Sequence, residues 1–376
     1  MDIAVHASHL CQNREDGNQT YIKNLLPRLA GFEKDTYHLY YNSQPQAPLT
    51  HSHLKHHIYP EPFAWTQRVF PRILESDQPD LLFMPIQMLP FRKPQKLPSV
   101  VTIHDLAFFY YPETFPIKDR TLHKLYVKEA IYQADSLIAI TEATKNDILH
   151  RYDVPDEKIH VVHHGIDHER FRPATEHDQE SITQVKNTYG ISKPYILYVG
   201  NVQPRKNIQG LIKAYQILRA HHKDIDCQLV IAGAEAWMVD KSLKKVHNNW
   251  ENDIIFTGRF QDQELAPLLW GATGFTLPSF YEGFGLPTLE AMACGTPVIV
   301  ADTPALVEVA GDAALAADPH TPKAMAEQLH TLLCQDTLRQ DLIQQGYKRA
   351  HTFSWEKSAE ETHNILHHVY ENRFSR

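Results

Sequence analysis

The chain has 376 residues, 43% of them hydrophobic, and a formal net charge of −8 at pH 7. This length suits two domains, each able to bury a core of ordinary size. An acidic chain lacks the basic field that nucleic-acid-binding proteins use, so nucleic acid is excluded as its main partner.

Short apolar runs alternate with segments of helical periodicity along the whole chain. In the first half these runs predict strands at residues 3–7, 37–41, 81–84, 100–103, 136–140 and 159–162. In the second half they predict strands at residues 195–199, 228–232, 254–257, 274–277 and 297–300. Helical patterns such as residues 208–220 lie between them. This alternation is typical of parallel sheets covered by helices on both faces.

A polar stretch at residues 171–192 separates the two series of strands and shows no pattern of buried residues. We therefore predict an α/β protein of two Rossmann-like, doubly wound domains, at residues 1–172 and 193–355, joined by a linker. In such sheets ligands bind beyond the carboxyl ends of the strands, so the loops that follow strands are the candidate sites.

The most specific motif is S-F-Y-E-G-F-G-L-P-T-L-E at residues 279–290, directly after a predicted strand. Gly283 and Gly285 predict a tight loop, Pro287 suits the first turn of a helix, and Gly295 is placed to end it. The start of such a helix presents N–H groups and a positive dipole end to a phosphate.

Glu290 is the only charged residue between Glu282 and Asp302. A carboxylate among apolar residues is costly unless it meets hydrogen-bond donors, and a ribose diol supplies two. The alternative is that Glu290 reaches solvent at the edge of its helix.

A second motif, V-G-N-V-Q-P-R-K-N at residues 199–207, follows the first strand of the second half. Arg205 and Lys206 are placed to neutralise a diphosphate, with Gly200 in the same loop. Asn207 is predicted to cap the next helix.

In the first half, His104 ends a predicted strand and Gly17 lies in the loop after another. His104 can hydrogen-bond a sugar hydroxyl or a developing oxyanion, although a structural histidine explains the position equally well. Gly17 lets backbone approach a ligand, and Asp105 is predicted to turn its loop.

At these residues the chain resembles the retaining glycosyltransferases of family 4, which have the two-domain GT-B fold. The resemblance covers nearly the whole chain. Its motifs are the loop at Gly17, H-D-L at 104–106, T-E-A-T-K at 141–145, G-I-D at 165–167, P-R-K-N at 204–207, residues 282–290 and F-S-W at 353–355. The loop D-G-N-Q at 16–19 departs from the family's usual G-I-G type of run.

The resemblance implies a catalytic set and a set of substrate-binding residues on either side of a cleft. The catalytic set is His104, Arg205, Lys206 and Glu282. The substrate-binding set is Gly17, Gly200, Arg205, Lys206, Glu282, Gly283, Phe284, Gly285, Leu286 and Glu290. In it, Arg205 and Lys206 hold the diphosphate and Glu290 the ribose, while the helix at 356–376 returns to the first domain.

The resemblance also implies the reaction, in which a hexose moves from a nucleoside-diphosphate sugar to a glycan or lipid-linked acceptor. Similarity to mannosyl-transferring relatives favours mannose and a GDP-linked donor, with a UDP-linked donor left open. We expect no cofactor and no metal. The one D-x-D motif, residues 224–226, precedes a predicted strand and so lies at the wrong end. His51, His53, His56 and His57 are interpreted as a solvated loop or strand edge.

Two further expectations concern location. Arg120, Lys124 and Lys128 recur at four-residue spacing, which suits either an anionic membrane surface or a solvated helix face. The amino-terminal segment does not have the form of a signal peptide, and no apolar run is long enough to span a bilayer. Four widely spaced cysteines are typical of reduced thiols, so we expect a cytoplasmic protein.

Rival hypotheses remain. A nucleotide-sugar epimerase or a phosphorylase can use the same fold, and a non-catalytic nucleotide-sugar-binding protein can carry the same residues. A nicotinamide oxidoreductase is disfavoured because neither half contains G-x-G-x-x-G at the start of its first helix.

Overall fold

The computed structural model describes residues 1–12, 16–60, 64–234, 250 and 252–374. They form two compact units. Unit 1 comprises residues 1–109 and 116–165 together with the chain from Ser354 onward, and unit 2 comprises residues 110–115 and 166–353. The main division therefore falls at residues 165 and 166, whereas the sequence places it at residue 172.

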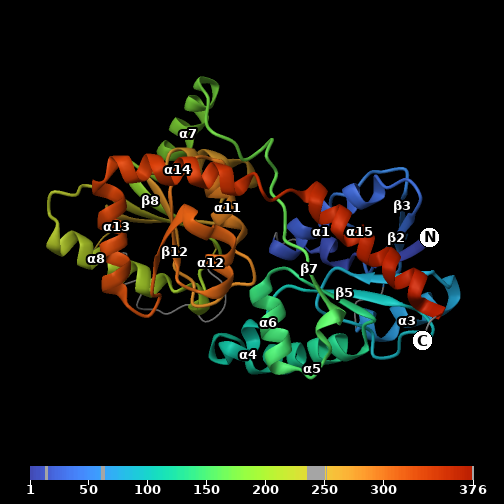
Figure 1. The fold of residues 1–376 in the computed structure, drawn as a ribbon. Coiled ribbons are helices and arrows are strands. Elements are labelled where there is room, and N and C mark those ends of the chain that lie inside the picture. The colour runs from blue at the N-terminus through green and yellow to red at the C-terminus, as the bar shows by residue number, and fades with distance from the viewer. Residues whose placement is uncertain (13–15, 61–63, 235–249, 251, 375–376) are drawn as a thin grey trace. The chain divides into compact units, whose positions relative to one another are not determined.

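Unit 1 is built on a seven-stranded sheet of order β3-β2-β1-β4-β5-β6-β7 (Figure 1). Its strands are β1 (Asp2–His6), β2 (Thr36–Tyr41), β3 (Leu54–Ile58), β4 (Leu81–Met84), β5 (Ser99–Ile103), β6 (Ser136–Ala139) and β7 (Ile159–Val161). Every pairing between these strands is parallel. The central strands β4, β5 and β6 are buried at every position, because helices cover both faces.

The helices of unit 1 connect these strands. They are α1 (Gly17–Ala30), α2 (Trp65–Arg68), α3 (Phe70–Asp77), α4 (Ala107–Tyr110), α5 (Ile117–Gln133), α6 (Glu142–Arg151) and α15 (Trp355–Glu371). Side-chain caps fix the starts of three of them: Asp16 accepts a hydrogen bond from the backbone of Gln19 at α1, Thr141 accepts one from Thr144 at α6, and Ser354 accepts one from Lys357 at α15.

Helix α15 comes from the end of the chain and packs along α1 (Figure 1). Its first turn lies so close to Gly165 that a Cβ atom there would lie 2.0 Å from the backbone nitrogen of Trp355. Ser358 donates a hydrogen bond to the carbonyl of His163 at 2.5 Å, and Arg28 of α1 pairs with Glu356 at 2.6 Å. The glycine is therefore what lets α15 dock at this point.

Unit 2 contains a six-stranded sheet of order β10-β9-β8-β11-β12-β13. Its strands are β8 (Tyr195–Val199), β9 (Gln228–Ala232), β10 (Ile254–Gly258), β11 (Gly274–Leu277), β12 (Val298–Ala301) and β13 (Ala314–Ala317). All pairings between these strands are again parallel. The predicted fold class, two doubly wound parallel sheets, is confirmed.

The helices labelled in unit 2 alternate with its strands. They are α7 (Gln179–Tyr189), α8 (Ile208–His221), α10 (Leu265–Trp270), α11 (Leu286–Ala293), α12 (Pro304–Ala310), α13 (Pro322–Cys334) and α14 (Asp336–Ala350). Helix α7 lies inside the stretch predicted to be a linker without a core pattern, so that prediction is wrong there. Ile182 and Val185 are buried on one face of α7, and Gly190 ends it at φ +68°.

Two strands were not predicted, and both lie at sheet edges. In β3, polar residues interrupt the apolar pattern, and the rings of His56 and His57 stack on Tyr41 and Tyr40. The histidine-rich stretch is thus partly a strand edge, one of the two structures expected for it. Strand β13 is a short alanine-rich run, A-L-A-A, which has little intrinsic preference for a strand.

A short segment of the first half, residues 110–115, belongs to unit 2. The ring of Tyr110 stacks on Tyr281 with centroids 5.5 Å apart, and Tyr111 stacks on Phe280 at 5.9 Å. Phe280 in turn stacks on His320 at 4.9 Å. Aromatic contacts therefore hold this segment against the loop that follows β11.

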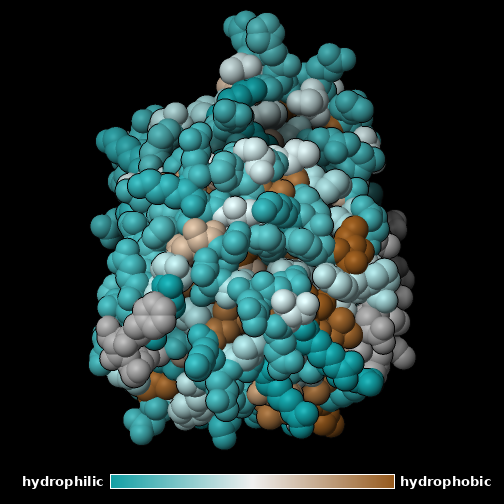
Figure 2. Space-filling model, turned by 90° about the vertical axis from the view of Figure 1, so that its right-hand side faces the viewer, coloured by the Kyte–Doolittle hydropathy of each residue, from teal (hydrophilic) through white to brown (hydrophobic). Residues whose placement is uncertain are grey.

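On the face shown in Figure 2, hydrophilic side chains predominate and hydrophobic ones are scattered in small groups. Among the described residues, no helix combines the length and the apolar character needed to cross a bilayer.

Candidate active site

The topology of unit 2 singles out two loops. Strand β8 is the first strand of this unit, and the order runs outward from it in both directions, to β9 and β10 on one side and to β11 on the other. In doubly wound sheets, the loops after two such neighbouring strands are where ligands bind. Arg205 and Lys206 lie in the first loop, and Glu282 lies in the second.

These three side chains form one ion cluster. Lys206 Nζ lies 2.5 Å from Glu282 Oε1, and Arg205 Nη1 lies 3.2 Å from Glu282 Oε2. Arg205 also donates to the carbonyl of Tyr281, and its own carbonyl accepts from the backbone of Phe280 at 3.0 Å. Two cations and one carboxylate leave about one unit of positive charge in a nearly buried position.

Glu282 is ionised in this setting. Burial alone would raise its pKa, but Lys206 and Arg205 outweigh burial and lower the pKa to about 2. Ser279 donates a further hydrogen bond to Oε1 at 2.6 Å. The carboxylate therefore stays charged at neutral pH and holds both cations in place.

Asn207 joins three loops, a role that the sequence did not reveal. Its backbone is left-handed, at φ +56°, and its side-chain oxygen caps α8 by accepting from Gly210. Its amide nitrogen donates to the carbonyls of Pro278 at 3.1 Å and Pro319 at 2.8 Å. The loops after β8, β11 and β13 are thus fixed to one another. The predicted cap is confirmed, but the two long-range bonds had no local signal.

The glycine-containing loop leads into α11 as predicted. Gly285 is the N-cap of α11 at φ +93°, and a Cβ atom there would lie 2.5 Å from a methyl group of Leu306. Leu286 is the first residue of the helix, and the buried ring of Phe284 packs edge-on against Phe353 at 5.9 Å. For Gly283, Phe284 and Leu286, backbone contact with a ligand stays a prediction.

Gly200 begins the loop after β8 at φ +145°, and its backbone nitrogen donates to the carbonyl of Ala232 at 2.9 Å. A Cβ atom on neighbouring Gly233 would lie 2.0 Å from the carbonyl oxygen of Gly200. The two glycines therefore let the loops after β8 and β9 approach each other.

Glu290 faces a different set of charges from Glu282. It lies half-buried on α11. Burial raises its pKa to about 7; the charge of Asp262 also raises the pKa, and the charge of Arg170 lowers it. Arg170 is itself paired with Asp262 at 2.8 Å. Within the described residues the Glu290 carboxylate makes no hydrogen bond. Its oxygens are not among the buried atoms that lack a partner, so contact with a ribose diol stays a prediction beside the alternative of contact with solvent.

In unit 1, His104 follows β5 and is buried. Its Nε2 lies 2.8 Å from the carbonyl of Pro85, so this nitrogen carries the proton, and burial lowers the pKa of the ring. A neutral ring with a protonated Nε2 leaves Nδ1 as an acceptor. A nitrogen that accepts suits the hydroxyl of a sugar, which donates a hydrogen bond. It does not suit a developing oxyanion, the other partner considered for His104. Asp105 turns its loop, as predicted, by accepting from the backbone of Ala107 at 3.0 Å.

Gly17 is the first residue of α1 and is exposed, with no atom near the position of a Cβ. It therefore lies at a helix start and not within a loop, and its contact with an acceptor stays a prediction.

The D-x-D motif lies before β9, at the amino end of the sheet, where exposed Asp226 pairs with Lys193 at 2.8 Å. This is the placement that the sequence predicted.

The chain matches two families. Residues 16–170 match the family described as "Glycosyltransferase Family 4", and residues 181–349 match "Glycosyl transferases group 1". It is 32% identical over 272 residues to O-antigen chain mannosyltransferase B of Escherichia coli, covering 71% of this chain and 69% of that protein. It is 30% identical over 287 residues to D-inositol 3-phosphate glycosyltransferase of Corynebacterium glutamicum (strain R), covering 74% of this chain and 68% of that protein.

Solved structures share the fold. Sucrose-phosphate synthase from Thermosynechococcus elongatus aligns with a TM-score of 0.76 at 19% identity, covering 98% of this chain and 99% of that one. Anabaena HepE in complex with UDP and glucose aligns with a TM-score of 0.71 at 16% identity, covering 97% of this chain and 99% of that one.

Two doubly wound units, one with an Arg-Lys-Glu cluster formed by the loops after β8 and β11, together with these matches define a glycosyltransferase of the GT-B fold. The chain belongs to glycosyltransferase family 4. The predicted family, fold and enzyme class are confirmed.

Proposed function

We propose that this glycosyltransferase moves a hexose, mannose in the first instance, from a nucleoside-diphosphate sugar to a glycan or lipid-linked acceptor, with retention and without a metal ion. The observation that carries the proposal is the cluster of Arg205, Lys206 and Glu282 beside the start of α11. A nearly buried site with net positive charge suits a diphosphate.

The chemistry follows from where charge develops. As the bond between the anomeric carbon and the diphosphate oxygen breaks, negative charge grows on the leaving diphosphate while the acceptor oxygen bonds to the carbon and loses its proton. Arg205 and Lys206 stabilise that charge in the transition state, in the role that a metal ion has in metal-dependent transferases. Glu282 keeps the two cations oriented before the donor arrives.

Two further residues complete the donor site in this proposal. Glu290 accepts hydrogen bonds from the ribose hydroxyls, which supply the donors that its carboxylate lacks within the described residues. His104 accepts from a hydroxyl of the transferred sugar through Nδ1. The backbone at residues 283–286 faces the sugar and the phosphate.

The relatives support the choice of sugar. O-antigen chain mannosyltransferase B is named for mannose transfer, whereas HepE was solved with UDP. We therefore favour GDP-mannose as the donor, with UDP-linked sugars as the alternative to be tested.

The test is nucleotide release from a panel of GDP- and UDP-linked hexoses, with and without a polyprenyl-linked glycan acceptor. We expect release to depend on the acceptor and to continue in excess chelator, with NMR showing the anomeric configuration of the donor in the product. Acceptor-independent conversion of one nucleotide sugar into another would instead indicate an epimerase. Complete loss of transfer in chelator, restored by Mn²⁺, would contradict metal independence.

For the acceptor side we propose that α5 contacts an anionic membrane surface. Lys124 lies over the ring of Phe109 at 4.9 Å, whereas Lys128 is exposed. Ile117 and Leu125 on the same helix are 74% and 49% exposed, and such apolar side chains beside lysines suit a headgroup interface. Co-sedimentation with phosphatidylglycerol vesicles at low salt tests this, and equal recovery of wild type and Lys128→Glu would contradict it.

A further inference from the structure

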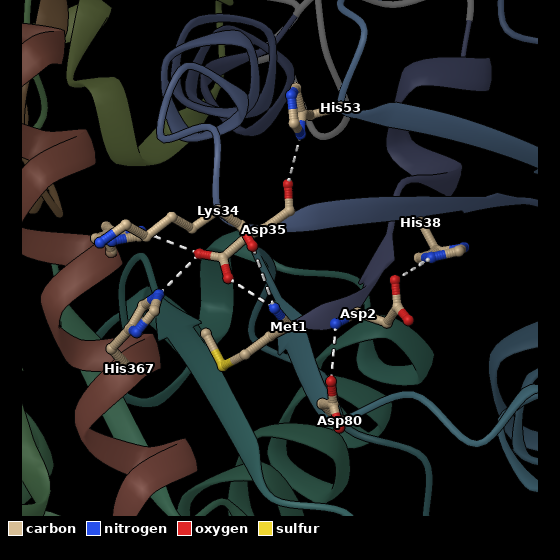
Figure 3. A network of polar contacts seen from close by, with 9 residues as sticks. Met1, Asp2, Lys34, Asp35, His38, His53, Asp80 and His367 are labelled. Carbon is tan, nitrogen blue, oxygen red and sulfur yellow. Dashed lines mark hydrogen bonds and ion pairs between the residues drawn. The ribbon is translucent and has the colours of Figure 1, made fainter.

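Asp35 and two histidines of α15, far from it in the sequence, form one cluster in unit 1. Figure 3 shows the contact between Asp35 and His367. Asp35 lies between α1 and β2, and His363 and His367 lie one turn apart on α15. The ligand atoms of these residues all lie within 4.8 Å of one another. None of the three belongs to the proposed donor or acceptor site.

The carboxylate of Asp35 is the centre of the cluster, and its side chain is 1% exposed. Its Oδ2 lies 2.8 Å from Nε2 of His367 and 3.5 Å from Nδ1 of His363. Its Oδ1 lies 3.0 Å from the amino group of Met1. The Asp35 carboxylate thus has a nitrogen partner at each oxygen, an imidazole at Oδ2 and the amino group at Oδ1.

Hydrogen bonding alone leaves one nitrogen of the cluster unused. Nδ1 of His363 is shielded from solvent and makes no hydrogen bond, although it lies 3.5 Å from Oδ2 of Asp35. The ring is held by stacking on Phe32, with centroids 4.3 Å apart. The same ring also lies beside that of His367, with centroids 4.2 Å apart.

We propose that Asp35, His363 and His367 bind a zinc-class divalent ion that fastens α15 to the edge of α1 and β2. Two imidazoles and a carboxylate are ligands that Zn²⁺ prefers, and two histidines at i and i+4 on a helix present their rings to one ion. Tetrahedral bonds of about 2.0–2.2 Å place ligand atoms roughly 3.3–3.5 Å apart. The His363 contact already has that length, and the His367 contact needs to open by roughly half an ångström.

The two histidines of the cluster are only partly buried. The side chains of His363 and His367 are 16% and 29% exposed, which leaves a path for the ion and for a water ligand. Binding moves the proton of His367 from Nε2 to Nδ1, because a metal-bound nitrogen cannot keep its proton. No step of glycosyl transfer depends on this ion, so its failure would not weaken the proposed function.

The experiment uses the full chain, freed of metal with chelator and titrated with Zn²⁺ by calorimetry and with Co²⁺ by visible absorption. We expect one site per chain in wild type, a rise in Tm with Zn²⁺, and Co²⁺ bands of tetrahedral geometry. The double variant His363→Ala/His367→Ala should lose all three. His368→Ala, an exposed neighbour on the same helix, should keep them.

His363→Gln is the milder variant, since it removes the ring stacked on Phe32 but leaves the Asp35–His367 contact intact. We expect its metal-free Tm to match wild type and its Zn²⁺ affinity to fall at least tenfold. Unchanged Zn²⁺ binding in this variant, or no binding by folded wild type, would overturn the proposal in favour of a hydrogen-bonded contact alone.

Discussion

At the scale of single residues, the ion cluster makes Lys206 and Glu282 dependent on each other. Glu282 is ionised because Lys206 and Arg205 lie beside it, and the cations are oriented because Glu282 holds them. Since the folded-state pKa of Glu282 is depressed, its contribution to stability is present above the unfolded value of 4.5. That contribution is lost as pH falls from there toward about 2.

We predict that Lys206→Ala lowers turnover by roughly ten- to more than a hundredfold. One charge-assisted hydrogen bond to the leaving group is worth about 1.5–3 kcal/mol in the transition state. Glu282 retains Arg205 and Ser279 as partners, so the fold should persist, which circular dichroism and Tm would check.

Two further variants separate charge balance from catalysis. Lys206→Ala combined with Glu282→Gln should recover any stability lost on removing one partner of a buried ion pair, but not turnover. Lys213→Ala, an exposed lysine of α8, should behave as wild type. Wild-type kcat in the Lys206→Ala enzyme would contradict the role assigned to this residue.

The raised pKa of Glu290 makes a second residue-level prediction. With a pKa of about 7 in the free enzyme, the carboxyl is largely protonated at pH 6 and largely ionised at pH 8. Ribose hydroxyls donate best to the ionised form, so GDP affinity should fall by about tenfold between pH 8 and pH 6. Isothermal titration at several pH values measures this.

Glu290→Gln is the matched control. A glutamine side chain does not titrate between pH 6 and pH 8, whereas the phosphate of GDP titrates with both proteins. The affinity of this variant for GDP should therefore vary less with pH than that of wild type.

The raised pKa of Glu290 also means that the folded state binds more protons than the unfolded state between pH 4.5 and 7, so the stability of the fold falls as pH rises through that interval. Parallel pH profiles for wild type and Glu290→Gln would rule out the ribose role.

At the scale of elements, unit 1 depends on how α15 docks. Gly165 lies against the backbone of Trp355, and backbone cannot rotate aside as a side chain can. We predict that Gly165→Ala lowers the free energy of unfolding by about 1–3 kcal/mol or more, the usual cost of overpacking. Denaturant unfolding measures the loss.

Gly17→Ala is the matched change at a position where the new methyl group meets nothing within 4 Å. It should leave stability unchanged or slightly increased, because alanine favours a helix more than glycine does. Equal stability of the two variants would show that the approach of α15 to residue 165 is looser than the structure indicates.

At the scale of the whole molecule, the nucleotide contacts of the proposal all lie in unit 2, whereas His104 is assigned to the transferred sugar. A nucleotide at a free concentration of about one hundred times its Kd stabilises the folded state that binds it by about 2.7 kcal/mol. Hydrogen exchange with GDP should therefore show slower exchange in residues 200–207 and 278–290, with β4 and β5 of unit 1 little changed. UDP provides the comparison that identifies the base, and protection confined to unit 1 would contradict the site.

Much of the fold could be predicted because its signals are local. Continuous apolar runs, separated by helical segments, predicted all the central strands. A strand buried on both faces must be apolar along its length. The loop at Gly285 and the cap at Asn207 were predictable because backbone conformation restricts residue type at those positions. The edge strands β3 and β13 were missed because they lack such a run, and α7 was missed because only two of its residues are buried.

The sequence by itself determined two parallel α/β units and the loops that carry Arg205, Lys206 and Glu282, because strand burial and loop chemistry are written in neighbouring residues. Only the tertiary structure decided that Glu282 holds both cations, although 76 residues separate it from Lys206. It also brought Asp35 to His367, 332 residues along the chain. Such contacts depend on how strands and helices pack, and no local pattern specifies which distant side chains will meet.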